Sequence, residues 1–350
     1  MKRTLIAAAA MLAAGAAFAQ SSVTLYGRVN TSVEYQTTKP AGGSSSHVTA
    51  LQNNASRWGL RGSEDLGGGF KGLFVLESGF SSDTGAGTSR LFGRESWVGL
   101  QTPYGRLRLG NMGPSAAYYT TADYISMHNH DTGTSSDAFY LYPGVMQNTV
   151  AFNTVSYGGL TVEGQYGLKQ TVDPATGIAS ESNAGTYSGV LAVNYDRGPL
   201  HLGASFVDST SATLDGVTGT DGKEYGLRAL YELGAFTVGA YYVRNEVDNG
   251  TPEAKRDSYR VSAMYTLGGS EFHVNVGYAD KIKRETGTKA ASDAIQYTVA
   301  YNYNLSKRTK VYAFYTKVDN KAAATYSAFG NTVAGGTDTS SFALGVRHNF

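Results

Sequence analysis

Arginine is the residue type whose placement first suggests a chemistry for this chain. Six arginines lie inside alternating apolar segments between residues 28 and 108: Arg28, Arg57, Arg61, Arg94, Arg106 and Arg108. A guanidinium group stays charged at any physiological pH and binds carboxylates and phosphates in a fixed geometry. Several of them on one surface would attract and guide anions.

The sequence lacks the motifs of common reaction centres. It contains no cysteine, no Gly-x-Ser-x-Gly elbow, no phosphate loop and no dinucleotide fingerprint. His128, His130 and Asp131 lie close together, but zinc sites use three or four converging ligands and no further cluster supports them. We therefore expect no enzyme activity, no cofactor and no metal.

Composition excludes further classes of protein. The chain has 29 basic and 28 acidic residues, so it lacks the basic excess of nucleic-acid-binding proteins. Only 16% of its residues are charged, yet the mean hydropathy is still −0.26. Glycine (44 residues) and tyrosine (25 residues) are abundant instead. This balance favours many short strands and turns over a helical enzyme.

The first nineteen residues are typical of a secretory signal peptide. Lys2 and Arg3 are followed by an uncharged apolar stretch, which ends in the small-residue pattern Ala17-Phe18-Ala19. The apolar stretch is too short for the ~20 residues of a membrane-spanning helix. We expect cleavage after Ala19, which divides the chain into a signal peptide (1–19) and one exported domain (20–350).

After residue 20 the dominant pattern has a period of two. In residues 295–305, for example, Ile, Tyr, Val and Leu alternate with Gln, Thr, Ala and Asn. Such a period places the two sets on opposite faces of a strand. Sixteen segments carry it, near 23–36, 56–63, 70–80, 93–101, 105–111, 147–156, 160–169, 186–196, 200–208, 223–233, 235–245, 257–267, 271–281, 294–304, 309–319 and 339–350.

The connectors between these segments alternate in length. Seven are tight turns, and eight are long loops at 37–55, 81–92, 112–146, 170–185, 209–222, 246–256, 282–293 and 320–338. Membrane barrels of the outer-membrane type have this alternation, an apolar face toward lipid and a polar lumen. We predict an all-β fold: a 16-stranded antiparallel transmembrane β-barrel. Sixteen strands leave an aqueous channel, whereas eight leave an interior filled by side chains.

Strand parity assigns the arginines to a side of the wall. If Leu25, Val29 and Val33 face lipid, Arg28 faces the lumen. By the same rule, outward Trp58, Leu60, Trp97, Leu107 and Leu109 place Arg57, Arg61, Arg94, Arg106 and Arg108 inward, and outward Phe74 and Leu76 place Glu77 inward. An arginine facing lipid near the midplane would cost about 2–4 kcal/mol, which favours this assignment.

Five segments resemble the trimeric general porins of Gram-negative bacteria, especially those of β-proteobacteria. These are SVTLYGRV at 22–29, SRWGLRGSEDLGGG at 56–69, ESWVGL at 95–100, YGRLRLG at 104–110 and the terminal GVRHNF at 345–350. The resemblance covers the whole chain after the signal peptide. It implies an outer-membrane homotrimer of water-filled barrels that admit small hydrophilic solutes and ions by passive diffusion.

The resemblance also implies that the third outer loop, about 112–146, folds inward and narrows the pore. Basic residues of the early strands would face acidic residues of that loop, and Arg28, Arg57 and Arg94 fall at matching places. The predicted constriction comprises basic Arg28, Arg57, Arg61 and Arg94 and acidic Asp123, Asp131 and Glu77. Arg106 and Arg108 directly precede the loop, so we expect them to anchor it.

Several properties remain predictions or alternatives. The inward arginines outnumber inward glutamates on the early strands, which predicts a slight anion preference. Small residues at Gly27, Thr31, Gly59 and Gly62, read as outward, would let barrels pack closely. Outer-membrane lipid and lipopolysaccharide would contact the outer face. The alternatives are a substrate-specific channel and a surface adhesin or structural barrel whose loops bind a partner.

Overall fold

The architecture is described by a computed structural model. It covers residues 22–125, 137–141, 146–168, 170–172, 179–181, 188–210, 212–214, 217–219, 221–248, 253–285 and 287–350. The predicted signal peptide lies outside these ranges. Across the described ranges, no helix has the length and apolar character needed to cross a membrane.

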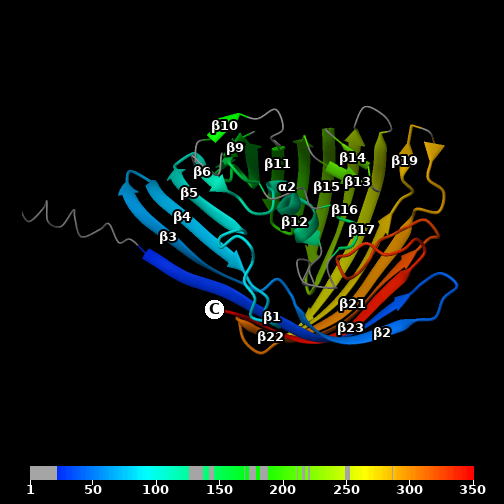
Figure 1. Ribbon diagram of the computed structural model, residues 1–350. Helices are drawn as coiled ribbons and strands as arrows, with labels where there is room; N and C mark the ends of the chain where they lie inside the picture. The colour runs from blue at the N-terminus through cyan, green and yellow to red at the C-terminus, as the bar shows by residue number, and fades with distance from the viewer. Residues whose placement is uncertain are drawn as a thin grey trace, which may run out of the picture.

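A single closed wall of sixteen long antiparallel strands dominates the described part of the chain (Figure 1). Its strands are β1 (Ser22–Lys39), β3 (Arg57–Gly67), β4 (Phe70–Gly79), β5 (Glu95–Thr102), β6 (Gly105–Asn111), β7 (Thr149–Thr154), β8 (Leu160–Gly167), β11 (Ser188–Arg197), β12 (Leu200–Ser209), β15 (Asp221–Leu233), β16 (Phe236–Asp248), β17 (Ala254–Leu267), β18 (Ser270–Ala279), β21 (Ala294–Asn304), β22 (Thr309–Asn320) and β23 (Asp338–Asn349). The predicted fold is therefore confirmed.

The ends of the chain close the wall. β1 pairs with β23 from Arg28 opposite Asn349 to Lys39 opposite Asp338, and blue and red strands run side by side in Figure 1. The backbone of Gly27 exchanges two hydrogen bonds with that of Phe350, which extends the seam to the last residue. Closure pairs the backbone N–H and C=O groups that lipid cannot solvate.

The outer loops contain more regular structure than the sequence predicts. β1 continues to Lys39 and pairs with β2 (Ser46–Asn53), so much of the predicted loop 37–55 is a β-hairpin. Ala55, with a positive φ of 54°, separates β2 from β3. The predicted loops at 170–185, 209–222 and 282–293 likewise contain β9 (Gln170–Val172) with β10 (Ala179–Glu181), β13 (Ala212–Leu214) with β14 (Val217–Gly219), and β19 (Lys283–Arg284) with β20 (Gly287–Thr288).

Side chains alternate between an apolar outer face and a polar lumen. On β1, Val23 and Leu25 are 65% and 58% exposed on the outer face, whereas Asn30 and Glu34 are fully buried on the lumen side. Leu25 lies directly opposite Leu60 of β3, so the outer face continues from strand to strand. In a bilayer the exposed apolar residues meet lipid, which removes their cost of exposure.

Two parity assignments are wrong. Trp97 lies inward, opposite Val75, while its neighbour Val98 is 60% exposed on the outer face. The tryptophan is buried because the third loop covers it, so its size no longer predicts a lipid contact. Gly59 also faces the lumen, where an added Cβ would meet the ring of Tyr26. Gly62 does face outward, against Phe74.

The tight turn between β3 and β4 needs glycine. Gly67, Gly68 and Gly69 all have positive φ angles, of 81°, 61° and 83°. Side chains other than glycine rarely adopt this conformation. The run is therefore a turn, as its position at a predicted tight connector indicates.

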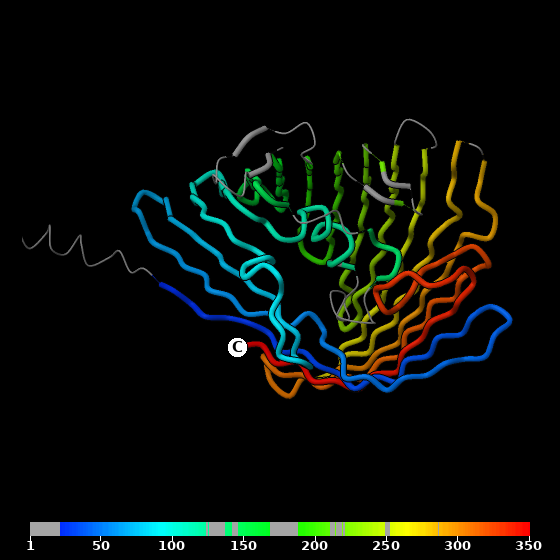
Figure 2. The backbone as a smooth tube through the Cα atoms, in the orientation of Figure 1, coloured from blue at the N-terminus to red at the C-terminus, as the bar shows by residue number. Residues whose placement is uncertain are grey.

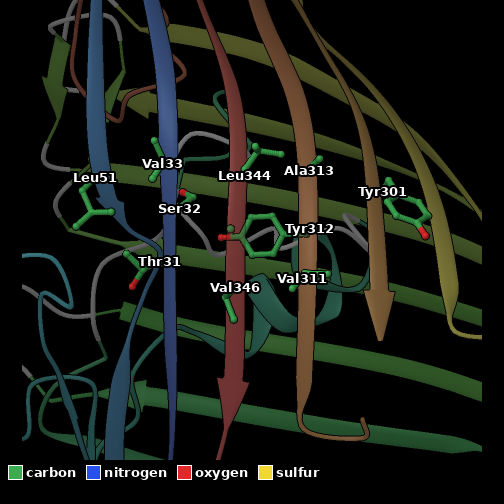
Figure 3. A pocket seen from close by; sticks show the side chains of 11 residues that line it. Thr31, Ser32, Val33, Leu51, Tyr301, Val311, Tyr312, Ala313, Leu344 and Val346 are labelled. Carbon is green, nitrogen blue, oxygen red and sulfur yellow. The ribbon is translucent and has the colours of Figure 1, made fainter. Parts of the chain in front are cut away.

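A groove of about 490 Å³ lies on the outer face (Figure 3). The small side chains Thr31 and Ala313 line it together with the larger Leu51, Leu344 and Tyr301. It spans β1, β2, β21, β22 and β23, where the barrel closes, and lies on the opposite side of the wall from the arginines.

Candidate pore constriction

The segment between β6 and β7 turns into the barrel instead of projecting from it. In Figure 2 the tube leaves β6 and coils within the wall, and Figure 1 labels helix α2 (Ala116–Thr120) there. Helix α3 (Ala122–Ile125) follows. The inward-folded third loop is thus confirmed for residues 112–125, 137–141 and 146, the parts of 112–146 that the structure describes.

Two hydrogen bonds from the wall fix helix α2. Gln165 of β8 accepts a hydrogen bond from the Ala116 backbone N–H at 3.0 Å. Asn194 of β11 donates its amide to the Thr120 hydroxyl at 3.0 Å. Each bond satisfies a polar group at one end of a helix too short to be stable alone. Because both partners lie in the wall, the position of α2 is set by the barrel.

An apolar cluster lies beneath this part of the loop. Trp97, Met112, Ala116 and Ala117 are buried together, with Val190 of β11. The Trp97 indole N–H donates to Glu95 at 2.8 Å, so its polar atom is also satisfied. The small side chains of Ala116 and Ala117 let the start of α2 approach the strands closely.

A buried ion pair holds the later part of the loop. Asp137 accepts from the Arg260 guanidinium of β17 at 2.8 Å, and both side chains are almost fully buried. The Tyr241 hydroxyl of β16 donates to the same carboxylate. Arg260 also donates to Gln296 at 2.8 Å, and Gln296 accepts from the Ala138 backbone N–H at 2.9 Å. Three strands therefore hold one short stretch of chain.

Residues 139 and 140 extend this anchor. Arg256 of β17 donates to the carbonyl of Phe139, and its other terminal nitrogen donates to Tyr326 at 3.2 Å. The Tyr140 hydroxyl donates to Glu224 of β15 at 2.9 Å. Burial, with the adjacent carboxylate, raises the pKa of the Tyr140 hydroxyl well above its usual value. Tyr140 consequently stays protonated as a donor.

Early-strand arginines line the wall opposite these anchors. Arg28 and Arg57 are directly opposed on β1 and β3. Glu77 of β4 lies 2.6 Å from Arg94 Nε and 3.9 Å from Arg57 Nε, so one carboxylate serves two guanidinium groups. Arg61 stacks over the Tyr26 ring at 5.1 Å. The wall here carries more positive than negative charge.

Asp123 and Tyr119 face these arginines from the loop. Asp123 is exposed to the lumen and accepts from the Tyr118 hydroxyl at 3.1 Å. The enclosing wall raises the pKa of the Tyr119 hydroxyl, and the charges of Glu95, Arg94, Asp123 and Arg57 all act on it. The Tyr119 phenol therefore lies between the acidic loop residue Asp123 and the basic wall residues Arg94 and Arg57.

The predicted site residues have different locations. Arg28, Arg57, Arg61 and Glu77 face the lumen as parity predicts. The parity argument places Arg94 in the lumen because it takes Trp97 as outward, whereas Trp97 lies inward. Arg94 precedes β5 and still contacts the lumen residue Glu77. Asp131, with His128 and His130, lies outside the described residues.

Arg106 and Arg108, predicted to anchor the loop, contact the wall instead. Arg108 forms an ion pair with Glu163 of β8 and stacks over Trp97 at 5.6 Å. Arg106 donates to Gln101 of β5 at 3.4 Å. The anchoring role belongs to Asp137, Arg256, Arg260 and Glu224. The sequence contains a signal for two of these residues. Arg256 and Arg260 lie at even-numbered positions of β17, whereas the outward-facing Tyr259 and Val261 lie at odd-numbered positions.

Fold and site together define a channel: a closed wall, a polar lumen, and a constriction made by an inward loop facing a basic strand cluster. The chain belongs to the Gram-negative porin family, whose model matches residues 6–323. It is 31% identical to outer membrane porin protein 32 of Delftia acidovorans and 29% identical to an outer membrane porin protein of Bordetella pertussis, in each case over the full length of both chains.

Solved structures agree with this family. The anion-selective porin from Comamonas acidovorans is 28% identical and superposes with a TM-score of 0.76, over 95% of this chain and 100% of that one. The OmpF structure from Salmonella typhi shares the fold at 16% identity and a TM-score of 0.64. The protein is therefore an outer-membrane porin of a Gram-negative bacterium, a water-filled channel for passive diffusion of ions and small hydrophilic solutes.

Proposed function

We propose that the channel is weakly anion-selective and that its selectivity arises at the constriction. The supporting observation is the charge balance of the early strands, where Arg28, Arg57, Arg61 and Arg94 face Glu77, Glu95 and the loop residue Asp123. Clusters of charge at a narrow point of low dielectric bias which ions pass. The similarity to the anion-selective porin from Comamonas acidovorans supports the same sign.

The test is the reversal potential of the purified protein in a planar lipid bilayer under a KCl gradient. A potential that indicates a chloride permeability above that of potassium is the expected result. A cation preference would overturn the proposal. Large ohmic steps without block by a single solute would separate a general pore from a substrate-specific channel, and an absence of steps would favour the adhesin alternative.

We infer that the assembly is a homotrimer. The OmpT structure from Vibrio cholerae described as a trimer shares the fold at 16% identity and a TM-score of 0.66. In this chain, the small outward residues Thr31 and Gly62 on β1 and β3 would allow close approach of two barrels. Analytical ultracentrifugation in mild detergent should give the mass of three chains. A monomer under these conditions would contradict the inference.

The division of the chain into a cleaved signal peptide (1–19) and a mature barrel (20–350) is also proposed. The basic start, the apolar stretch and the small residues before Gln20 support it. Mass spectrometry of protein extracted from outer membranes should find Gln20 at the N-terminus. An N-terminus elsewhere would shift or remove the cleavage site.

Lipopolysaccharide is the proposed partner at the outer rim. Arg244 of β16 and Lys283 of β19 point outward near the loop end of the wall and share Asp257, at 2.8 and 3.1 Å. Their partial exposure, 40% and 50%, leaves both available to phosphate groups. Native mass spectrometry should show less bound lipopolysaccharide for Arg244→Gln with Lys283→Gln than for the lumen variant Lys71→Gln. Equal amounts would count against this contact.

A further inference from the structure

Strand β2 has a free edge at the outer surface of the wall. Among the strands that the structure describes, it pairs only with β1, over residues 46–53. The next strand of the wall, β4, pairs with β3 and ends at Gly79, opposite Arg57, so it does not reach β2. In Figure 3, β2 is the strand that carries Leu51, beside β1 with its labelled Val33. The closure of the barrel therefore leaves one stretch of strand edge unpaired within a single copy.

The hydrogen-bond register shows which backbone groups lie at this edge. The Asn54 N–H donates to the Asn30 carbonyl at 2.9 Å, one step beyond the pairing of β1 with β2. Directly hydrogen-bonded pairs recur at every second residue of an antiparallel ladder. The even-numbered residues of β2 therefore bond to β1, and the odd-numbered residues direct their N–H and C=O groups to the free edge. For His47, Thr49 and Leu51, no partner for these groups lies in the described ranges.

The outward side chains fix the depth of the edge in the membrane. On β22, β23 and β1 they change along each strand from polar to aromatic to aliphatic, as the outer face of a membrane barrel does at its interface with water. β2 continues each of these rows, so Thr49 lies at the aromatic level and Leu51 at the aliphatic level. The rows are Lys317, Ser340, Thr37 and His47; Tyr315, Phe342, Tyr35 and Thr49; and Ala313, Leu344, Val33 and Leu51.

An unpaired edge at this depth needs a polypeptide partner. Hydrocarbon offers no hydrogen bonds to backbone groups, and open sheet edges do not face lipid. Leu51 is 54% exposed and Val33, opposite it, is 53% exposed, so no other part of the described chain covers this stretch. Acyl chains would cover the two side chains but would leave the N–H and C=O of Leu51 without partners. An extended segment that adds to the edge as a strand would satisfy both.

The groove on the outer face adjoins this edge. Leu51 belongs to both, and the groove continues from it past Thr31 and Ala313 to Tyr301 (Figure 3). One partner that paired with β2 would therefore also cover the groove. Thr31 is, in addition, one of the small outward residues proposed above to let two barrels approach. This continuity identifies the partner as another barrel of the same assembly.

We propose that a second copy of this chain adds an extended segment to the edge of β2 and packs into the adjoining groove. The proposal rests on the proposed homotrimer and specifies its contact. In a ring of three copies, each contact joins two different surfaces. Each copy would thus present its β2 edge to one neighbour and supply the added segment to the other. The backbone groups of Thr49 and Leu51 become paired only in the assembly.

The first experiment removes one backbone donor from the edge. Thr49→Pro deletes an N–H that makes no bond within the chain, and proline is tolerated on an edge strand when its position faces away from the ladder. The rate at which folded trimers dissociate into folded monomers in warm detergent should rise at least about tenfold, because all three contacts lose a hydrogen bond. Gel mobility of unheated samples measures both species.

Thr49→Ala is the matched control, because it removes the side chain and keeps the N–H. Its dissociation rate should change less than about twofold, as expected for a surface substitution. A second experiment identifies the partner. In Leu51→benzoylphenylalanine, illumination should give covalent dimers of this chain, identified by mass spectrometry. Leu227→benzoylphenylalanine, on β15 and 56% exposed on the outer face, should give none. This measurement decides the proposal if Thr49→Pro folds poorly.

The outcomes separate this contact from the homotrimer itself. If the two Thr49 variants dissociate at the same rate, or if residue 51 cross-links only to lipid, lipopolysaccharide or a different protein, the β2 contact is wrong even when ultracentrifugation gives the mass of three chains. If ultracentrifugation gives a monomer, the homotrimer is wrong and this contact falls with it.

Discussion

At the scale of single residues, the net charge of the lumen wall depends on how many arginines share each carboxylate. Glu77 serves Arg94 and Arg57 together, so its one charge offsets only half of theirs. Asp123, in contrast, is exposed on the loop, so we expect its charge to act on ions in the lumen. Removal of a wall cation and removal of the loop anion should therefore shift selectivity in opposite directions.

Arg94→Ala should lower the chloride-to-potassium permeability ratio and Asp123→Asn should raise it. The expected change is about two- to fivefold, because a unit charge a few ångströms from an ion in water-like surroundings is worth ~1 kcal/mol or less. Reversal potentials in a KCl gradient measure both, with Lys283→Gln on the outer face as the control. Shifts of the same sign in the two variants would contradict the assignment of the constriction.

The buried pair of Asp137 and Arg260 makes a stability prediction. Asp137→Ala leaves a buried guanidinium without its partner, which typically costs about 3–5 kcal/mol. The double variant Asp137→Ala with Arg260→Met removes both charges and should lose less. Urea unfolding in detergent, followed by tryptophan fluorescence, compares the two. A single variant no less stable than the double variant would show that the pair does not carry this part of the loop.

At the scale of elements, the seam that closes the barrel depends on one close contact. Gly345 of β23 lies opposite Tyr312 of β22, and a Cβ at residue 345 would approach the tyrosine ring to 2.2 Å. The ring cannot move freely, because its hydroxyl donates to Asn30 and accepts from Asn54 at 2.9 Å. Because Gly345 has no side chain, the Tyr312 ring can pack directly over β23.

Gly345→Ala should consequently lower the unfolding temperature, through an overpacking cost of about 1–3 kcal/mol. Gly164→Ala on β8 is the matched control, since a Cβ there meets no atom within 4 Å. The temperature at which the barrel loses its folded gel mobility measures the difference. Equal temperatures for the two variants would mean that the seam adjusts without cost.

Strand elements could be predicted from sequence because a wall between lipid and water imposes a strict period of two. Leu25, Val29 and Arg28 follow it without exception. The outward orientation predicted for Trp97 is wrong because the third loop covers this part of the lumen wall and excludes water from it. That contact forms only in the folded protein, so the sequence pattern does not show it. The loop anchors were missed for the same reason: Asp137 and Arg260 are 123 residues apart, and nothing in the sequence pairs them.

At the scale of the whole molecule, positive charge follows one side of the lumen through its depth. It begins with Arg94, Arg57 and Arg28 beside the constriction and continues to Arg347 and Lys310 near the tight-turn mouth. The loop and its anchors occupy the opposite side, where Asp137 and Arg260 neutralise each other. An anion would thus find a continuous favourable wall, while the neutralised side contributes little field.

Such a wall predicts how selectivity depends on salt. The screening length is about 10 Å at 0.1 M ionic strength and about 3 Å at 1 M. The length at 1 M is shorter than the distance from the wall to the axis of an open pore. The chloride-to-potassium permeability ratio should therefore fall toward one as KCl concentration rises at a fixed gradient. Uncharged solutes of graded size supply the control, because their exclusion in liposome-swelling measurements depends on pore width and should not change with salt. A permeability ratio that stayed constant across this range would instead locate selectivity in direct, dehydrated contacts between chloride and the arginines.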